Sequence, residues 1–294
     1  MGERPHRVAV ISSDGDATAE TQRLLGALRD DGEVVVVANA ANIPADAAGI
    51  VAVGSAAIRE TIASAPGAPV IPVGDHRLAF DATTATRRAA ALVRAAVTEP
   101  AHAHYPCSPS RSAAVDGSES ATETPRDDPF DTGIRRVTHP ILGVDRDQTD
   151  DTGCRAGGDV ALVTTEPARI SEFALRLDRG RVASFRADGV VIATPFGSDG
   201  YASAAGGPTV APGGGLAVVP IAPFSTRTAV WIAADRVTLS VERETEPVSI
   251  VIDGEERGPV SPHRPLTIEV VDRVSLVVPI RGSARDDRKH SNNS

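Results

Sequence analysis

The sequence lacks several features on which whole classes of protein depend. Its two cysteines, Cys107 and Cys154, lie in polar, loop-like stretches and are too few and too dispersed for a zinc site or a secreted disulfide framework. Lys289 is the sole lysine, and the net charge of −9 argues against a nucleic-acid binder that relies on a broad basic face. No signal peptide and no apolar stretch of membrane-spanning length is evident, so we expect a soluble, cytoplasmic protein without membrane contact.

Aromatic residues are also scarce, at 3%, whereas alanine, valine and aspartate are abundant. This composition is typical of proteins from halophilic, GC-rich organisms, although codon bias alone predicts the same pattern. The length of 294 residues is sufficient for two domains that each have a core.

Strand and helix signals alternate along the first hundred residues. Strands are predicted at 7–11, 34–38, 50–53 and 70–73, and helices at 17–29, 56–65 and 83–97. This order predicts a parallel sheet with covering helices, and we assign it to a first domain at 1–98.

The amino-acid composition changes in the middle of the chain. Residues 99–133 are rich in Ser, Pro, His and acidic residues, which predicts a flexible insertion. His102 and His104 lie near Cys107 but lack a fourth ligand, so we predict no metal site there.

Short strands separated by turns follow, among them 248–252, 266–271 and 274–278, which predicts an all-β domain at 134–281. Asp253-Gly254 is a hairpin turn signal within this domain. The polar tail at 282–294 is expected to fray.

The most informative stretch is 186–208, RADGVVIATPFGSDGYASAAGGP. An apolar β-branched strand at 190–194 leads into a loop that is rich in glycine. Glycines at 197 and 200 leave room for backbone N–H groups to approach a planar base or a phosphate. An ordinary strand-turn-helix corner is the alternative that the residues alone leave open.

The same stretch resembles the adenine and nicotinamide pocket of the NAD kinase family. The matching segments recur in order and almost without gaps. They are Arg186-Ala187-Asp188-Gly189, Ala193-Thr194-Pro195, Gly197-Ser198, Tyr201 and Ala205-Gly206-Gly207-Pro208. A second matching segment, Pro69-Val70-Ile71-Pro72-Val73 with Arg77-Leu78-Ala79-Phe80, lies in the first domain.

The resemblance implies a fold of class α/β plus all-β, with an N-terminal parallel α/β domain followed by a β-rich NAD-kinase-type domain. It implies ATP-dependent 2′-phosphorylation of NAD(H) to NADP(H) with Mg²⁺, and a homo-oligomer. The ligand-binding positions it implies are Gly54, Phe80, Asp188, Thr194, Asp199, Gly200 and Tyr201. Phe80 also suits a core aromatic, and Asp188 also suits a turn cap.

The resemblance fails where the family carries its catalytic motif. Gly54-Ser55-Ala56-Ala57-Ile58 stands where the family has Gly-Gly-Asp-Gly-Thr. Ala56 replaces the aspartate and can neither accept a proton nor help to hold Mg²⁺. Loss of a positioned general base costs about 10² to 10⁴ in rate. No catalytic residue of the motif is therefore intact.

Other positions that face the ligand in the family are altered too. Val163 and Thr164 replace an Asn-Glu pair, Ala204 replaces a serine, and Asp199 stands where threonine is common. Each lost neutral hydrogen bond removes about 1 kcal/mol of affinity. We therefore predict a retained pocket with weakened ligand contacts.

Three carboxylates are candidate replacements for the lost base: Asp188, Asp199 and Asp14. Asp14 lies in a turn after the first strand, where a helix cap is the alternative. The competing hypothesis is a catalytically silent paralogue that senses a nucleotide or assembles with an active NAD kinase. A dehydrogenase is disfavoured because the first strand lacks a G-x-G-x-x-G turn.

Overall fold

The computed structural model describes residues 6–12, 18–98, 133–145, 154–166, 169–177, 180–225, 229–243 and 247–280. Asp14, the polar tail, and the insertion with His102, His104 and Cys107 lie outside the described residues.

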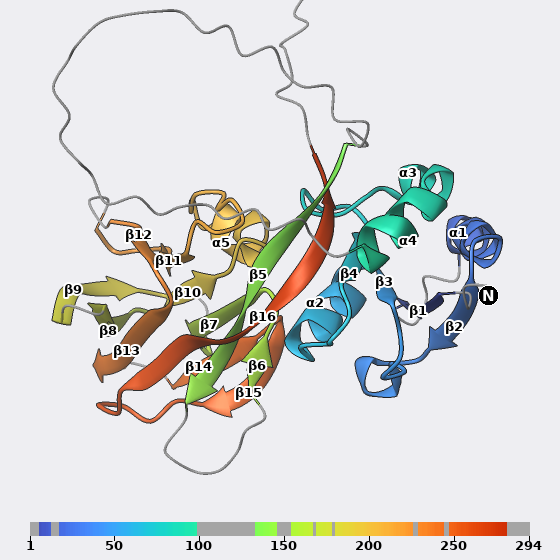
Figure 1. The fold of residues 1–294 in the computed structure, drawn as a ribbon. Helices are drawn as coiled ribbons and strands as arrows, with labels where there is room; N and C mark the ends of the chain where they lie inside the picture. Colours follow the sequence, from blue (N-terminus) through green and yellow to red (C-terminus); the bar gives the residue numbers. More distant parts are fainter. Residues whose placement is uncertain are drawn as a thin grey trace, which may run out of the picture.

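The N-terminal part is a parallel sheet with helices on both faces (Figure 1). Its strands are β1 (Arg7–Ser12), β2 (Glu33–Val37), β3 (Gly49–Val53) and β4 (Val70–Val73), in the spatial order β2-β1-β3-β4. Its helices are α1 (Ala19–Arg29), α2 (Ser55–Ala63), α3 (Ala82–Arg87) and α4 (Ala89–Val97), and the short η1 (Ala40–Asn42) follows β2.

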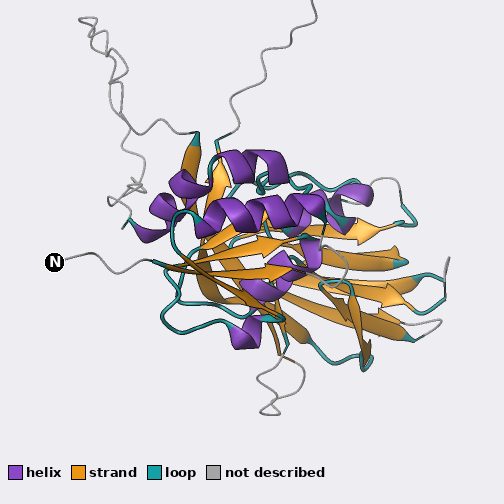
Figure 2. Cartoon of the chain, turned by 90° about the vertical axis from the view of Figure 1, so that its right-hand side faces the viewer, coloured by secondary structure: helices purple, strands orange, loops and turns teal. Residues whose placement is uncertain are grey.

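Alternation along each strand decides which helix covers which face. Val8 and Val10 of β1 point into a core with Leu24 of α1, and α3 and α4 contribute to the same core. Ala9 of β1 points to the opposite face, where Ile58 and the rest of the buried side of α2 pack. The helices therefore divide between the two faces of the sheet, as Figure 2 shows from the side.

The C-terminal part is a sandwich of strands. Six strands form one sheet in the order β12-β11-β10-β7-β14-β15: β7 (Asp159–Thr164), β10 (Gly189–Ala193), β11 (Leu216–Ile221), β12 (Trp231–Ala233), β14 (Val248–Ile252) and β15 (Glu255–Pro259). The facing layer contains β5 (Ile134–Asp145), β6 (Arg155–Ala156), β8 (Ser171–Leu177), β9 (Gly180–Ala187), β13 (Arg236–Arg243) and β16 (Leu266–Pro279). The largest apolar core fills the space between the two layers.

The outer face of the six-stranded sheet has its own small core. Ala161 of β7 and Val191 of β10 pack there against Ala202 of α5 (Tyr201–Ala204). A short 3₁₀ turn, η2 (Gly197–Asp199), leads from β10 into α5. The glycine-rich stretch predicted from the sequence thus lies on this outer face.

Strand β16 joins the two parts of the chain. It pairs with β4 in parallel through Leu276 and Val70, and with β13 in antiparallel fashion through its first residues. It also pairs along most of its length with β5. The predicted fold class, α/β plus all-β, is confirmed.

Two sequence predictions of secondary structure were wrong in detail. The strands predicted at 266–271 and 274–278 are one strand, because a bulge between Val270 and Asp272 lets the pairing with β5 continue. The helix predicted at 83–97 is broken at Arg88, which leaves the helical region with φ −112° and ψ 13°. The predicted turn at Asp253-Gly254 is confirmed and connects β14 to β15.

Within these ranges, no helix combines the length and the apolar character that a bilayer crossing requires.

Candidate functional site

One wall of the site is the edge at which β3 and β4 end. Gly54 follows β3 with a left-handed φ of 88°, which suits a residue without a side chain, and α2 begins directly after it. Its N–H donates to the Val73 carbonyl at 2.9 Å, and a Cβ on Gly74 would lie 3.7 Å from the Gly54 nitrogen. Two glycine turns therefore meet at the carboxyl ends of the strands, the edge at which open α/β sheets bind ligands.

The first turn of α2 carries no acidic residue. Ser55 and Ala56 are exposed at the start of the helix, and Ala57 is buried against the sheet. A side chain at position 56 therefore points away from the core. A carboxylate placed there would lie near the positive end of the helix dipole.

A cavity of about 620 Å³ lies beside the loop that follows β4. Its lining includes Gly74, Asp75, His76, Phe80 and Arg88. Phe80 is 2% exposed and packs in the core under α1, α3 and α4, so its ring forms part of that core as well as part of the cavity wall.

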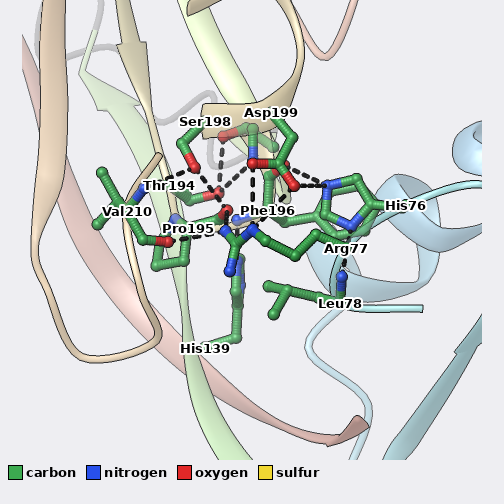
Figure 3. A network of polar contacts seen from close by, with 12 residues as sticks. His76, Arg77, Leu78, His139, Thr194, Pro195, Phe196, Ser198, Asp199 and Val210 are labelled. Carbon is green, nitrogen blue, oxygen red and sulfur yellow. Dashed lines mark hydrogen bonds and ion pairs between the residues drawn. The ribbon is translucent and has the colours of Figure 1, made fainter. Parts of the chain in front are cut away.

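Arg77 ties this loop to the loop after β10 (Figure 3). Its Nε donates to both carboxylate oxygens of Asp199, at 3.2 and 3.0 Å. Its Nη2 donates to the carbonyls of Pro195 at 3.1 Å and Val210 at 2.9 Å. One guanidinium thus holds two segments of the second domain against the first, and the Asp199 carboxylate is paired with it.

His76 makes a second link between these loops (Figure 3). Its Nδ1 accepts the Leu78 N–H at 3.0 Å, so Nε2 carries the proton that it donates to the Phe196 carbonyl at 2.9 Å. The two rings stack with centroids 3.9 Å apart. Burial is the main cause that lowers the pKa of His76, although the Asp199 carboxylate 3.5 Å away opposes the effect.

His139 of β5 forms a hydrogen bond with the loop that contains Phe196. Its side chain is fully buried, and its Nε2 accepts the Phe196 N–H at 3.1 Å. Burial lowers the pKa of this imidazole to about 3, and the neighbouring His76 adds to the shift. His139 is therefore neutral at physiological pH, which the hydrogen bond requires because a protonated ring has no acceptor.

Thr194 and Ser198 hold the inside of the same loop. The Thr194 hydroxyl contacts the carbonyls of Gly157 at 3.0 Å and Gly158 at 2.8 Å, and its oxygen accepts the Gly197 N–H at 3.2 Å. Ser198 donates to Pro195 and accepts from Val210. Both side chains are 0% exposed, so they position the backbone of the loop.

Tyr201 and Asp188 lie on the outer side of the loop. Tyr201 is 45% exposed at the start of α5, and Asp188 is half-buried in the turn between β9 and β10. Partial burial raises the pKa of the Tyr201 phenol, and the charges of Asp188 and Asp159 raise it further. The phenol and the two carboxylates therefore share one electrostatic environment.

Asp159 belongs to an acidic pair with Asp253. Asp253 Oδ1 accepts the N–H groups of Gly158 at 2.7 Å and Asp159 at 3.0 Å, and Oδ2 accepts that of Gly157 at 2.7 Å. Asp159 is 5% exposed. Burial raises the pKa of Asp159 to about 6, and the charge of Asp253 contributes to the rise. Burial also raises the pKa of Asp253.

Arg59 reaches this acidic pair from α2. A Cβ on Gly158 would lie 3.1 Å from Arg59 Nε, and one on Gly200 would lie 3.7 Å from Nη2. The positive charge of Arg59 lowers the pKa of both aspartates, but burial outweighs it. This further contact between the two parts of the chain thus brings one cation and two carboxylates into the same electrostatic environment.

Comparison with known proteins connects this geometry to one family. Residues 158–280 match the family described as ATP-NAD kinase C-terminal domain. An NAD kinase of Methanoregula boonei is 36% identical over 120 residues, which are 40% of this chain and 40% of that protein. The C-terminal part of the chain, residues 158–280, belongs to the NAD kinase family.

The relatives resemble this chain over less than half of their length. A bifunctional NADP phosphatase/NAD kinase of Methanocaldococcus jannaschii is 34% identical over 123 residues, 41% of this chain and 21% of that protein. The matched length in both relatives is thus well below two thirds of the whole protein.

Solved NAD kinase structures share the fold over nearly the whole chain. That of Archaeoglobus fulgidus NAD kinase in complex with ATP has a TM-score of 0.59 at 22% identity, with 92% of each chain covered. That of yeast NADH kinase with NADH has a TM-score of 0.62 at 14% identity, with 94% of this chain and 84% of that chain covered. The N-terminal half, which lies outside the family match, therefore also folds as in these kinases.

The structure brings most of the predicted NAD kinase positions to the junction of the two parts. Gly54 and Phe80 lie on the first-domain side, and Asp199 and Gly200 lie on the second-domain side, next to Arg77 and Arg59. Val163 packs against the core under α5, and Ala204 is exposed at the end of α5. The roles of these residues in binding NAD remain predictions.

Four residues that build this junction were not predicted from the sequence. They are Arg59, His76, His139 and Asp159. Asp159 could have been noticed in the sequence, because it is a carboxylate between a glycine pair and an apolar run. This pattern places it at the start of a buried strand. The others lie in ordinary helix, loop and strand patterns and become recognisable only through their partners.

Mg²⁺, which family membership implies, finds no built site in the described part of the chain. No group of three or more His, Cys, Asp or Glu side chains is arranged there to hold a metal ion. Asp253 is committed to three backbone N–H groups, and Ala56 offers no ligand. The side chains do not fit a resident Mg²⁺, and we assign no catalytic step to one.

Proposed function

We propose that this protein binds NAD or NADH between the start of α2 and the loop after β10. We further propose that it slowly transfers the γ-phosphoryl group of ATP to the 2′-hydroxyl of the adenosine ribose, which yields NADP or NADPH. The proposal is supported by the name NAD kinase of the relatives and by the ATP bound in the Archaeoglobus fulgidus structure.

The observation that carries this proposal is the junction itself. Gly54 lies between the end of β3 and the start of α2 and has no side chain to cover the backbone there. Arg77 binds Asp199 and so holds the loop with Asp199 and Gly200 next to the first domain. Backbone N–H groups at such turns can approach phosphates closely. Tyr201 adds an exposed aromatic ring at the same place. These features suit a planar base linked to a pyrophosphate.

The slow rate follows from Ala56. A methyl group at this exposed position cannot accept the proton of a hydroxyl, and removal of a general base typically costs about 10² to 10⁴ in rate. The contacts that position the substrates do not depend on that carboxylate. Turnover should therefore persist at a low level.

The decisive experiment restores the missing carboxylate. Purified protein is incubated with ATP, Mg²⁺, high salt and NAD, and NADP is measured enzymatically. We expect Ala56→Asp to form NADP faster than the wild type, by a factor of at most about 10² to 10⁴. Ala56→Asn is the matched control, because its amide has nearly the same shape and cannot act as a base. The exposed position lets all three proteins fold.

The outcome separates the proposed function from its competitor. If neither the wild type nor Ala56→Asp forms NADP above a reaction without ATP, the kinase proposal is wrong. A rise in both Ala56→Asp and Ala56→Asn would show that bulk, not proton transfer, limits the reaction.

A catalytically silent nucleotide sensor is the second candidate. It is favoured by the pairing of Asp199 with Arg77, which leaves this carboxylate occupied while the loop remains in place. Calorimetry would then detect binding of NAD, NADP, ATP or ADP to the wild type, and no variant at position 56 would turn over. Absence of heat with all four ligands would contradict the sensor.

Assembly and location remain proposals as well. We propose a cytoplasmic homo-oligomer or a complex with an active NAD kinase chain, as family resemblance implies. Light scattering on the purified protein and co-purification from the source organism would distinguish a monomer, a homo-oligomer and a mixed complex.

A further inference from the structure

Asp159 combines features that a purely structural carboxylate does not need. It is 5% exposed, and the hydrogen bonds that residue 159 makes with Asp253 come from its backbone N–H and carbonyl groups. Its neighbour Asp253, by contrast, has three backbone N–H groups as donors. A buried carboxylate destabilises a fold, so its presence favours a functional explanation.

The position of Asp159 in β7 places its side chain on the outer face of the six-stranded sheet. Side chains alternate along a strand, and Val160 points into the core between the sheets. Asp159 therefore shares the outer face with Ala161, the face that α5 covers. A Cβ on Gly197 would lie 3.1 Å from the Asp159 Cβ, which places Asp159 beside the η2 turn.

The first domain reaches the same point through α2. Arg59 lies one turn after Ala56, so the two side chains project from the same side of the helix. Arg59 Nε lies beside Gly158, and its charge acts on Asp159. The Asp159 carboxylate thus lies within electrostatic reach of α2, the helix whose first turn lacks the family's aspartate.

The glycines before Asp159 make this approach possible. A Cβ on Gly157 would lie 2.6 Å from the Arg59 carbonyl oxygen, and one on Gly158 would lie 2.8 Å from Asp253 Oδ1. Contacts below 3.0 Å require the surroundings to move. Residues with side chains at these positions would push the start of β7 away from α2.

We propose that Asp159 is the proton acceptor in the phosphoryl transfer, in place of the carboxylate lost at Ala56. This inference rests on the proposed function. The Asp159 carboxylate accepts the proton of the ribose 2′-hydroxyl as that oxygen bonds to the γ-phosphorus of ATP. The bond between this phosphorus and the β–γ bridging oxygen breaks, and ADP leaves with the electron pair. Asp159 then returns the proton to water.

The charged groups around Asp159 are suited to this task. Asp253 raises the proton affinity of Asp159, and Arg59 limits the rise. Tyr201 and Asp188 share the environment on the α5 side. A carboxylate whose pKa lies near 6 is deprotonated at neutral pH and is still a stronger base than an exposed one.

The test uses Asp159→Asn, with Asp235→Asn as the matched control at an exposed turn. We expect Asp159→Asn to lower kcat for NADP formation by about 10² to 10⁴ with KM for NAD changed less than about threefold. Asp235→Asn should retain wild-type turnover. The wild-type rate should rise with pH, with its midpoint near pH 6, and the rise should vanish in Asp159→Asn.

A double variant separates proton transfer from a structural role. If Asp159 is the base, Ala56→Asp supplies a replacement, and Ala56→Asp with Asp159→Asn should keep at least about a tenth of the Ala56→Asp rate. If Asp159 only organises the junction, the loss should be equally large in both backgrounds, and the proposal is overturned. Calorimetry with NAD checks that each variant still binds.

Failure of this inference and failure of the proposed function look different. Wild-type activity that survives Asp159→Asn overturns the role of Asp159 alone. Absence of NADP from both the wild type and Ala56→Asp overturns the proposed function and, with it, this inference.

Discussion

Acidification is predicted to weaken the fold through His139. This imidazole is fully buried in β5, and its unprotonated Nε2 accepts the Phe196 N–H. In a protonated ring the Nε2–H group would face the Phe196 N–H, so that two donors would meet. The ring would also place a positive charge in an apolar core. The hydrogen bond under the Phe196 loop therefore depends on the neutral form.

The magnitude follows from the pKa of His139 in the two states. It is about 3 in the folded protein and 6.5 as the ordinary value expected after unfolding. Between these values the unfolded state binds more protons, so the free energy of unfolding falls as pH falls. From pH 7.5 to pH 4.5 the loss is about 3 kcal/mol, at about 1.4 kcal/mol for each pH unit below 6.5. Typical domains have only about 5–15 kcal/mol in total.

Asp159 acts in the opposite direction over part of this range. Its pKa is raised to about 6, so protonation between pH 6 and pH 4 favours the folded state. The wild-type profile alone therefore does not isolate His139. A variant that keeps the acceptor but does not titrate is needed.

His139→Gln supplies this variant, because its amide oxygen can accept the Phe196 N–H at all pH values. Urea unfolding is followed by the fluorescence of Trp231, the single tryptophan, which stacks on Phe185 in the sandwich. We expect the stability difference between wild type and His139→Gln to shift by about 3 kcal/mol, in favour of the variant, from pH 7.5 to pH 4.5. His6→Gln, at an exposed histidine, should leave the wild-type pH profile unchanged.

Parallel pH profiles for the wild type and His139→Gln would refute the reasoning. They would mean that His139 titrates alike in both states, which requires water or a counter-charge next to the ring.

Three further predictions concern stability and are measured by the same urea titration. Asp159→Asn should raise the free energy of unfolding at pH 7.5 by about 3 kcal/mol, because the buried charge is removed; unchanged stability would contradict the burial argument. Gly197→Ala should destabilise the protein by more than about 2 kcal/mol, because its Cβ would lie 2.2 Å from the Gly158 carbonyl oxygen. Gly26→Ala is the control in open space within α1 and should stabilise the protein by about 0.5–1 kcal/mol. Equal effects of the two variants would refute the packing argument. Arg77→Met should lower stability by about 2–3 kcal/mol and weaken NAD binding in calorimetry, because Asp199 and two carbonyls lose their donor; Asp199→Asn, which keeps an acceptor for Arg77, should have a smaller effect.

Local patterns in the sequence predicted much of the fold. The strand at 70–73 matches the observed β4, and the strand at 248–252 matches β14, because alternation and apolar runs reflect burial directly. The break at Arg88 was missed, since alanine-rich sequence on both sides has the helical period. The continuity of β16 was missed because a bulge is decided by the partner strand β5.

The candidate site was predicted less completely. The loop with Asp199 and Gly200 was recognisable from its glycines and its resemblance to NAD kinases. Its fastening to the first domain was not, because Arg77 and Asp199 are separated by 122 positions and neither residue is unusual in its local context.

The sequence by itself determined the fold class and indicated the family, and it predicted that Ala56 stands in the place of the family's aspartate, since these depend on residue order and local spacing. Only the tertiary structure decided which remaining groups can act. His139 is neutral and Asp159 is proton-binding near pH 6 because each is removed from water by segments distant in the chain. Desolvation depends on all the atoms around a group, and the fold alone brings those atoms together.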